Sequence, residues 1–515
     1  MPDDTSTSIS TDAQQDNLKR RTARSMKWNV IDRFGSQILY AVTGVVLARL
    51  LSQHDFGLVG AVLVFQAFAS LLIDSGLSSA LIQRKAPSRL DYSSVLWFNI
   101  IASITLYALL FVAAPAISGW FHGGDQLTAL ARVMFLSLPL NAAAIVQTNL
   151  YTKQLNVRPV AIANAIGLCA GAIIGIWLAF AGYGAWAIVW QTITVAAVKT
   201  LMLWIMSQWR PLYRLSWKAL WSFAGVGAGM TLTSLLNTIF QNIYAFLIGN
   251  RVGLVSLGYY SQADKWSKMM TASLSQVLTS TFVPVLSGVQ DQAERFARLA
   301  SKMDRVTAYI LFPVMVGLAV CATPIFHILF GAKWDASIIL FQLLLARGIF
   351  TVLTGLYSNY LLALGRARTI FYLEVLRDTV ALVAIAITFP YMALSTSDNI
   401  VLGVEILLWG QLAAAIVAWA ASLFAVSRAT AVPIRRYLAD IAPYAAMAVV
   451  IGAGMLAIGN ALAFSPWLAL PTQVVFGAAL YLGANRCLGS TVQNEALAYI
   501  LPRCKASKQG SSEDK

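Results

Sequence analysis

The chain has 515 residues, of which 58% are hydrophobic and 11% are charged, and its formal net charge is +15 at pH 7. A soluble globule has an apolar share near half and a charged share near a quarter, so the composition excludes one and indicates a polytopic membrane protein. The basic excess predicts no nucleic-acid partner, because membrane topology and the anionic headgroups of the lipid bilayer account for it.

Apolar runs predict an all-α fold with about 14 transmembrane helices, since a helix needs roughly 20 apolar residues to cross the hydrocarbon layer. Residues 1–27 are predicted to form a polar, basic tail, and residues 1–18 lack the apolar core and cleavage site of a signal peptide. The predicted spans are residues 28–50, 57–80, 93–117, 127–149, 159–181, 184–206, 219–248, 254–287, 304–331, 336–363, 370–391, 400–426, 438–459 and 466–486.

Basic residues alternate between the predicted loops. Of the 37 Lys and Arg residues, 27 fall in the two tails and in every second loop, whereas the opposite loops hold only Arg49, Arg251 and Lys333. Because short cytoplasmic loops retain Lys and Arg, we expect both termini to lie in the cytoplasm.

A weak internal repeat relates the two halves of the chain. The matching patterns are Arg33-x3-Gln37-x2-Tyr40 with Asn237-x3-Gln241-x2-Tyr244, and Arg49-x7-Gly57 with Arg251-x6-Gly258. They predict two six-helix lobes in a pseudo-twofold arrangement about an axis along the membrane normal, plus two extra C-terminal helices. The predicted divisions are the tail 1–27, an N-lobe at 28–208, a C-lobe at 209–428, two additional spans at 429–488 and a tail at 489–515.

Ionisable residues inside the spans are the first candidates for function, because a charge in hydrocarbon is costly unless it faces a partner or a wet cavity. The basic ones are Arg33, Arg132, Lys199, Lys265, Lys268, Arg347 and Arg377, and the acidic ones are Asp32, Asp74, Asp264, Glu374, Asp378 and Glu405. Asp264 and Lys268 are spaced i,i+4, and Glu374, Arg377 and Asp378 share a helical face. Local neutralisation therefore competes with a functional role in these two clusters.

Arg33 lies on a polar stripe with Gln37, Tyr40 and Gly44, which predicts that this stripe faces the protein interior. The neighbouring Asp32 either neutralises Arg33, with the pair touching lipid headgroups, or is a protonatable group coupled to a proton gradient.

Asn237, Gln241 and Tyr244 form the matching face of the seventh span. They serve either to pack helices through polar contacts or to line a cavity suited to sugar hydroxyl groups. Asp74, near the inner end of the second span, is either an inter-lobe gate or a helix cap in contact with Ser75.

The cysteines predict no disulfide, no metal site and no cofactor. The four of them, Cys169, Cys321, Cys487 and Cys504, are scattered without metal-ligand spacing.

Three stretches, LARLLSQHDFGLVGAVLVFQAF, DSGLSSALIQRK and VSLGYYSQADKW, resemble the Wzx-type polysaccharide flippases. The resemblance extends from about residue 28 to residue 436 and is greatest to the colanic-acid-exporter-like branch of the multidrug/oligosaccharidyl-lipid/polysaccharide superfamily. It implies a multi-pass protein of the bacterial inner membrane that is not an enzyme. Such a protein moves undecaprenyl-diphosphate-linked oligosaccharide repeat units from the cytoplasmic to the periplasmic leaflet, for exopolysaccharide or lipopolysaccharide biosynthesis.

The resemblance also implies a mechanism, in which two six-helix lobes flank a cationic central cavity and alternate their opening. On that hypothesis the diphosphate contacts are Arg33, Lys265 and Arg347, and the sugar contacts are Gln37, Tyr40, Asn237, Gln241 and Tyr244. Candidates for ion coupling or gating are Asp32, Asp74, Asp264, Glu374 and Asp378. A polymerase and a chain-length regulator of the same pathway are the implied protein partners.

Three other functions compete with this interpretation. A multidrug exporter of the same superfamily favours buried carboxylates over buried arginines, and the surplus of cations in the spans argues against it. A membrane glycosyltransferase or polymer ligase usually needs a long loop with carboxylates or histidine outside the membrane, which this sequence does not offer. A lipid II-type flippase, which differs in the sugar carried, is the nearest alternative.

Overall fold

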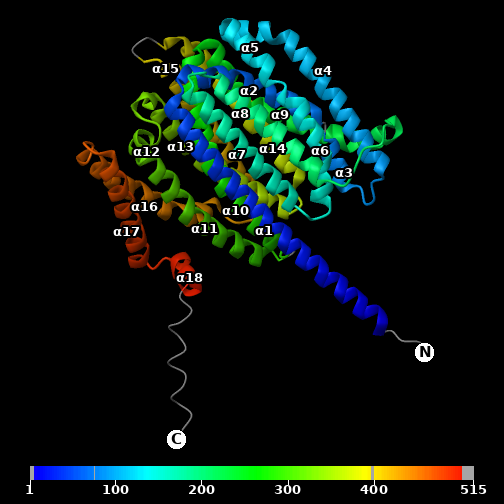
Figure 1. Ribbon diagram of the computed structural model, residues 1–515. Coiled ribbons are helices and arrows are strands. Elements are labelled where there is room, and N and C mark those ends of the chain that lie inside the picture. Colours follow the sequence, from blue (N-terminus) through cyan, green and yellow to red (C-terminus); the bar gives the residue numbers. More distant parts are fainter. Residues whose placement is uncertain (1–4, 75, 291, 396–398, 501–515) are drawn as a thin grey trace. The chain divides into compact units, whose positions relative to one another are not determined.

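The computed structural model describes residues 5–74, 76–290, 292–395 and 399–500, and every regular element in these ranges is helical (Figure 1). The α-helices are α1 (Thr5–Leu50), α2 (Gln53–Asp74), α3 (Leu77–Gln83), α4 (Arg89–Phe121), α5 (Gly124–Met134), α6 (Ser137–Lys153), α7 (Arg158–Phe180), α8 (Trp186–Met206), α9 (Trp217–Arg251), α10 (Leu254–Ser287), α11 (Ala293–Val320), α12 (Ala322–Leu329), α13 (Ala336–Ala363), α14 (Ala367–Thr388), α15 (Leu402–Thr430), α16 (Ile434–Ala461), α17 (Pro466–Cys487) and α18 (Thr491–Ile500). Two 3-10 helices, η1 (Ala332–Trp334) and η2 (Phe389–Leu394), complete the set. The all-α prediction is confirmed.

Twelve spans in the described part of the chain are long and apolar enough to cross a membrane, so the predicted count of fourteen is not confirmed. The other two predicted spans, 254–287 and 370–391, are formed as α10 and α14, helices of 34 and 22 residues. Their length suffices to cross the hydrocarbon layer. They are, however, the helices that carry the two predicted clusters of ionisable residues, and these charges lower their apolar character.

Several predicted spans are broken or shortened. The second span ends at Asp74 rather than at residue 80, because Gly76 adopts a left-handed conformation (φ 63°) before α3 begins. The fourth is divided into α5 and α6, and the ninth is divided at Cys321 into α11 and α12. At its other end, α1 continues back to Thr5, through most of the predicted tail.

The chain forms two compact units, Met1–Ser261 and Gln262–Lys515. In unit 1, α7 packs along α8 and α1, and α4 packs along α5 and α6. In unit 2, α13 and α14 pack on α15, and α11 and α17 pack on α16. α10 begins in unit 1 and ends in unit 2.

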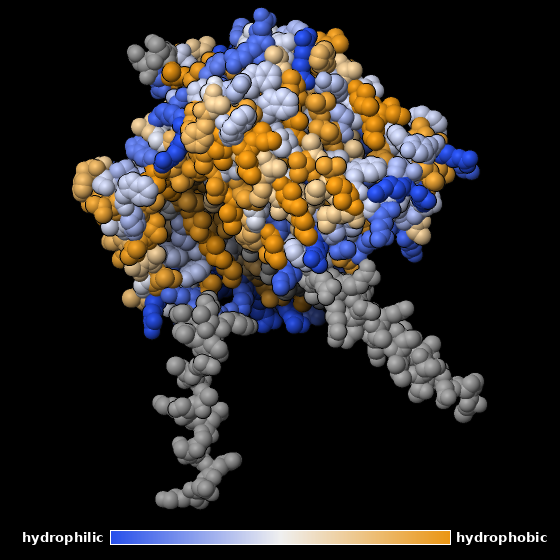
Figure 2. Space-filling model, viewed as in Figure 1, coloured by the Kyte–Doolittle hydropathy of each residue, from blue (hydrophilic) through white to orange (hydrophobic). Residues whose placement is uncertain are grey.

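The outward faces of the helices are largely apolar. Figure 2 shows hydrophobic side chains along the viewed face of the long helices and hydrophilic residues near their ends. Ile173, Trp177 and Phe180 of α7, for example, are 66 to 71% exposed. A helix with an exposed apolar face of this kind requires lipid around it, which agrees with the predicted membrane location.

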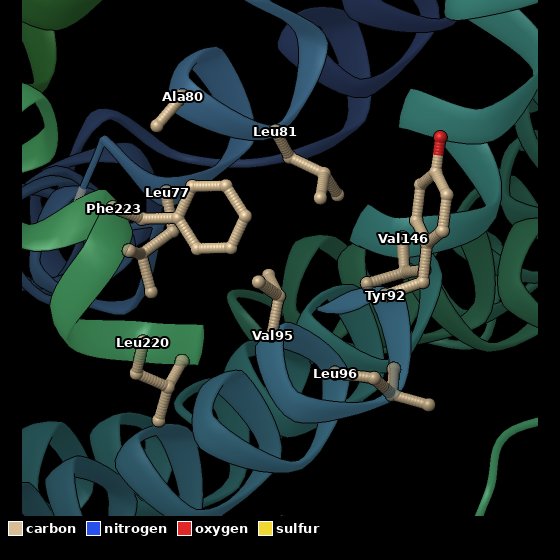
Figure 3. Close-up of a cluster of buried hydrophobic side chains, with 9 residues drawn as sticks. All are labelled: Leu77, Ala80, Leu81, Tyr92, Val95, Leu96, Val146, Leu220 and Phe223. Carbon is tan, nitrogen blue, oxygen red and sulfur yellow. The ribbon is translucent and has the colours of Figure 1, made fainter. Parts of the chain in front are cut away.

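A buried apolar cluster fixes the ends of four helices in unit 1 (Figure 3). It contains Leu77, Ala80, Leu81, Tyr92, Val95, Leu96, Val146, Leu220 and Phe223, from α3, α4, α6 and α9. A capping box begins α4, the helix that carries Tyr92, Val95 and Leu96. The Ser88 hydroxyl accepts a hydrogen bond from the backbone amide of Asp91, and the Asp91 carboxylate accepts one from the amide of Ser88. The guanidinium of Arg84 lies over the Phe223 ring at 4.9 Å and 3.6 Å from Asp91, so it covers one side of the cluster.

Two glycines allow α2 and the first turns of α10 to cross in close backbone contact. A Cβ atom on Gly57 would overlap the carbonyl oxygen of Leu254, and one on Gly258 would overlap the carbonyl oxygen of Gln53. Gln53 and Leu254 are the first residues of their helices, and each glycine follows four positions later. The contact is therefore reciprocal, with an offset of 201 residues in both pairs, which supports the internal repeat.

Replacing either glycine by alanine should destabilise the protein. Gly57→Ala and Gly258→Ala introduce a methyl group against backbone rather than against a flexible side chain, and such overpacking costs about 1–3 kcal/mol. Thermal unfolding of the purified protein in detergent measures the loss. Gly355→Ala is the matched control, because nothing lies within 4 Å of the Cβ it would add; it should be neutral or slightly stabilising. Equal melting temperatures for all three variants would contradict the close contact.

Candidate functional site

The first candidate site lies between α1, α7 and α8 in unit 1. The Asn164 side-chain amide donates to the Asp32 carboxylate, with its nitrogen 3.2 and 3.3 Å from the two oxygens. The Ser36 hydroxyl lies 3.3 Å from the same carboxylate, and Lys199 of α8 interacts with it electrostatically. Asp32 is thus held by groups on three helices.

Small residues bring α8 close enough to α7 to complete this cluster. Gly167, Gly171 and Gly175 occupy one face of α7, and a Cβ atom on any of them would lie within 3.0 Å of Val195 or Gln191 on α8. Glycines at this spacing let two membrane helices approach closely. The position of Lys199 beside α7 follows from this packing.

Arg33 is exposed and is not among the described groups that interact with Asp32. It takes part in no ion pair with any residue in the described part of the chain. Asp32 instead accepts a hydrogen bond from Asn164 and interacts electrostatically with Lys199. Of the other members of the predicted stripe, Gln37 is half-buried, Tyr40 is 47% exposed and Gly44 is buried.

The matching face on α9 is divided between solvent-accessible and buried positions. Gln241 is exposed and Asn237 is half-buried, whereas Tyr244 is only 4% exposed and packs inside unit 1. Asp74 lies at the C-terminal end of α2, where one carboxylate oxygen is buried without a hydrogen-bond partner among the described residues. Ser75, its predicted partner, lies outside the described residues.

The remaining candidates lie in unit 2 on α10, α13 and α14. Lys268 pairs with Asp264 at 2.7 Å, which is the predicted i,i+4 contact, and Arg377 pairs with Asp378 at 2.9 Å. Glu374 is half-buried on α14. Both ion pairs are therefore neutralised within their own helices.

Lys265 and Arg347 come from two helices that touch. A Cβ atom on Gly348 of α13 would lie 2.8 Å from the Thr271 hydroxyl of α10. Lys265 lies less than two turns before Thr271, and its ammonium group is 5.8 Å from the centre of the Trp266 ring. Arg347 is half-buried, about 16 Å along α13 from its first residue, and has no ion pair with any described residue.

Two groups of polar residues were not predicted as sites. Asn164 is an ordinary amide in an apolar run, and Lys199 was noted only as a charge inside a span. Asp304, fully buried in α11, lies at the first residue of the predicted span 304–331 and is not among the acidic candidates from the sequence. The sequence does not show that other helices bury Asp304 completely.

A multi-pass helical fold with ionisable groups inside its spans is what a membrane transport protein requires. Residues 46–339, more than half of the chain, match the family model described as polysaccharide biosynthesis protein. The chain therefore belongs to this family, and the resemblance predicted from the sequence is confirmed.

Known relatives agree with this assignment. The chain is 27% identical over 368 residues to the succinoglycan biosynthesis transport protein ExoT of Rhizobium meliloti (strain 1021), covering 71% of this chain and 74% of ExoT. It is 25% identical over 372 residues to the lipopolysaccharide biosynthesis protein WzxC of Escherichia coli (strain K12), covering 72% and 75%. These names accord with the prediction of a transport protein rather than an enzyme.

The fold also matches a solved structure. The lipid II flippase MurJ, in an inward closed conformation, superposes with a TM-score of 0.69 at 17% sequence identity, covering 92% of this chain and 99% of MurJ. At this identity the likeness concerns the fold alone.

A double-mutant cycle should identify the partner of Asp32. Asp32→Asn and Lys199→Met each remove the electrostatic interaction between the two side chains, so the double variant should lose less stability than the sum of the two. We expect a coupling on the order of 1 kcal/mol, read from unfolding of the purified protein in detergent.

The parallel cycle of Asp32→Asn with Arg33→Met is the control for that experiment. Because Arg33 is exposed and forms no ion pair with Asp32 among the described residues, its coupling to Asp32 should be close to zero. A larger coupling for Arg33 than for Lys199 would show that Asp32 neutralises Arg33 instead.

Proposed function

We propose that the chain is a flippase for undecaprenyl-diphosphate-linked oligosaccharide repeat units, which it moves from the cytoplasmic to the periplasmic leaflet of the bacterial inner membrane. Its family assignment and the names of its relatives support a role in supplying a polymer outside the cytoplasm. The alternation of basic loops supports the orientation, with both termini in the cytoplasm. A polymerase and a chain-length regulator would act on the product.

The observation that carries the proposal is the presence of two arginines without a counter-ion inside membrane spans. Arg33 and Arg347 form no ion pair among the described residues, and Arg347 lies far from either end of α13. A charged arginine near the middle of a bilayer costs about 2.5–3.5 kcal/mol on insertion scales. An anionic ligand or a wet cavity must offset that cost.

A diphosphate headgroup matches this requirement. Guanidinium groups bind phosphate oxygens through paired N–H donors, and Lys265 adds a third cation, whose ammonium group lies 5.8 Å from the centre of the Trp266 ring. In the proposed mechanism these three residues neutralise the diphosphate while the polyprenyl tail stays in the lipid. The free-energy barrier to moving the headgroup across the bilayer then falls, because contacts with these cations replace the contacts with water that the diphosphate loses.

The sugar part of the substrate would contact amide and hydroxyl groups. Gln37, Tyr40, Asn237 and Gln241 are at least partly accessible, so they can exchange hydrogen bonds with sugar hydroxyls. Tyr244 is buried in this conformation and would contact sugar only after α9 shifts. Such a shift is what alternating access requires of a helix that lines the path.

The unpaired cations also argue against a multidrug exporter. A site for cationic drugs needs exposed carboxylates, whereas Asp264 and Asp378 are both held by neighbouring cations. A lipid II-type flippase stays the nearest alternative, because its substrate has the same diphosphate and a different sugar.

Arg33→Ala and Arg347→Ala should each reduce polymer export by a factor on the order of ten or more, because a hydrogen bond to a charged group contributes about 1.5–3 kcal/mol. The measurement is surface polymer in a deletion strain complemented with each variant, normalised to the amount of tagged protein in the membrane. Lipid-linked repeat units should accumulate on the cytoplasmic side.

Arg366→Ala, which removes an exposed arginine just before α14, should leave export unchanged. Full export by both the Arg33 and Arg347 variants would remove these arginines from the site. If the deletion strain itself kept its polymer, the flippase function would be wrong.

A further inference from the structure

Unit 2 contains a carboxyl group that is buried more completely than any of the predicted candidates. Asp304 of α11 is 0% exposed, and its helix packs against α13 and α16. One of its oxygens, Oδ2, has no hydrogen-bond partner among the described residues. Thr307, one turn further along α11, also has a buried hydroxyl without a partner there.

The other Asp304 oxygen takes part in a short chain of hydrogen bonds. The Tyr360 hydroxyl of α13 lies 3.0 Å from Asp304 Oδ1 and 3.1 Å from the carbonyl oxygen of Ala300. If Asp304 is ionised, the single tyrosine proton must serve two acceptors. If Asp304 carries a proton, it donates to the tyrosine oxygen and the tyrosine donates to Ala300, so both bonds form completely.

Arg305, the cation next to Asp304 in the sequence, forms an ion pair with a different carboxylate. Arg305 lies 3.0 Å from the carboxylate of Asp440 on α16, and Ser301 donates a short hydrogen bond to the same carboxylate. Arg305 also donates to the Ser301 hydroxyl at 3.1 Å. An ionised Asp304 would therefore add a second negative charge beside a pair that is already neutral, at a large desolvation cost.

No further charge from the surrounding helices offsets it within the described part of the chain. Tyr357 of α13 and Tyr437 of α16 face the carboxyl with phenol rings, each 6.0 Å from the next in the series Tyr360, Tyr357, Tyr437. Trp419 of α15 lies beside Tyr357. Arg436 is exposed at the start of α16 and faces Tyr437.

We propose that Asp304 is a proton-binding site, occupied in this conformation, and that it exchanges its proton with the cytoplasm through the Arg305–Asp440 pair. The direction of this route is inferred from exposure, which rises from 0% at Asp304 to 12% at the Asp440 side chain and 36% at the Arg305 side chain. Tyr360 and Asp440 lie near the ends of α13 and α16 that the basic loops assign to the cytoplasm. Asp304 lies deeper, eleven residues after the first residue of α11, whose first turns carry Arg295, Arg298 and Lys302. The use of this proton to drive translocation rests on the proposed function; its binding does not.

Infrared difference spectroscopy of the full-length protein in detergent tests the binding directly. Subtracting the spectrum of Asp304→Asn from that of the wild type at neutral pH should leave one band of a protonated carboxyl group, which shifts in D₂O. The band should disappear as the pH is raised while the protein stays folded. A carboxylate band at neutral pH, or a protonated band that persists at every pH, would overturn the proposal.

Two variants and one ion act as controls. Asp440→Asn should remove a carboxylate band, because that group is paired with Arg305, and should spare the protonated band. Tyr360→Phe, which keeps the ring and removes the hydroxyl, should shift the protonated band and so gives a second result if Asp304→Asn fails to fold.

Replacing potassium with sodium at constant ionic strength should leave the protonated band unchanged. Displacement of the band by sodium would identify a sodium site instead.

The role in transport is tested in proteoliposomes loaded with a fluorescent polyprenyl-diphosphate-linked sugar. Wild-type protein should move this probe faster when a pH gradient is imposed, whereas Asp304→Asn should move it at a rate that the gradient does not change. An unchanged gradient response in the variant would overturn the coupling. If neither protein moved the probe, the flippase function would fail while the infrared result still decided the proton site.

Discussion

The crossing of α2 with the start of α10 is the contact on which the described part of unit 1 depends. Lipid tails are as apolar as leucine, so membrane helices are held together by close packing and hydrogen bonds rather than by exclusion of water. Gly57 and Gly258 allow backbone to meet backbone there. Three residues further along each helix, Gly60 faces Ser261 at the same offset of 201 residues. A side chain at either glycine would push the two helices apart.

Fixing α2 in this way also positions the polar cluster of unit 1. Asp55, between Gln53 and Gly57, accepts hydrogen bonds from the Ser52 amide and hydroxyl and from the amide of Ala185, at 2.8 Å in the last case. Ala185 immediately precedes α8, so the start of α2 holds the start of α8. Lys199 lies about three and a half turns into α8 and interacts electrostatically with Asp32. The backbone contact at Gly57 and Gly258, together with the packing of α8 on α7, thus determines where this charge lies in the membrane.

Local sequence spacing predicted the contacts that form within one helix and missed those between helices. Asp264 and Lys268 were expected to pair, and they do, because i,i+4 spacing alone places their side chains together. The Asp32–Asn164 bond joins residues 132 positions apart, so it depends on the rotation of two helices that no local pattern fixes. The sequence shows the repeated pattern that ends at Gly57 and Gly258. Only the backbone coordinates show that each of these glycines packs against the first residue of the other helix.

Charges inside the described spans are accommodated in three physically different ways, and the difference separates structure from function. Asp264 and Asp378 are neutralised by a cation on the same helix, which fixes nothing beyond that helix. Asp304 avoids its charge by holding a proton, on the proposal above, and can lose it when its surroundings open. Arg347 can do neither, since a guanidinium group keeps its proton and no described carboxylate pairs with it. An uncompensated charge of this kind is tolerated in the membrane only when an anion or water from outside the protein accompanies it. Binding of an anionic ligand at such a residue would therefore stabilise the conformation that holds the ligand.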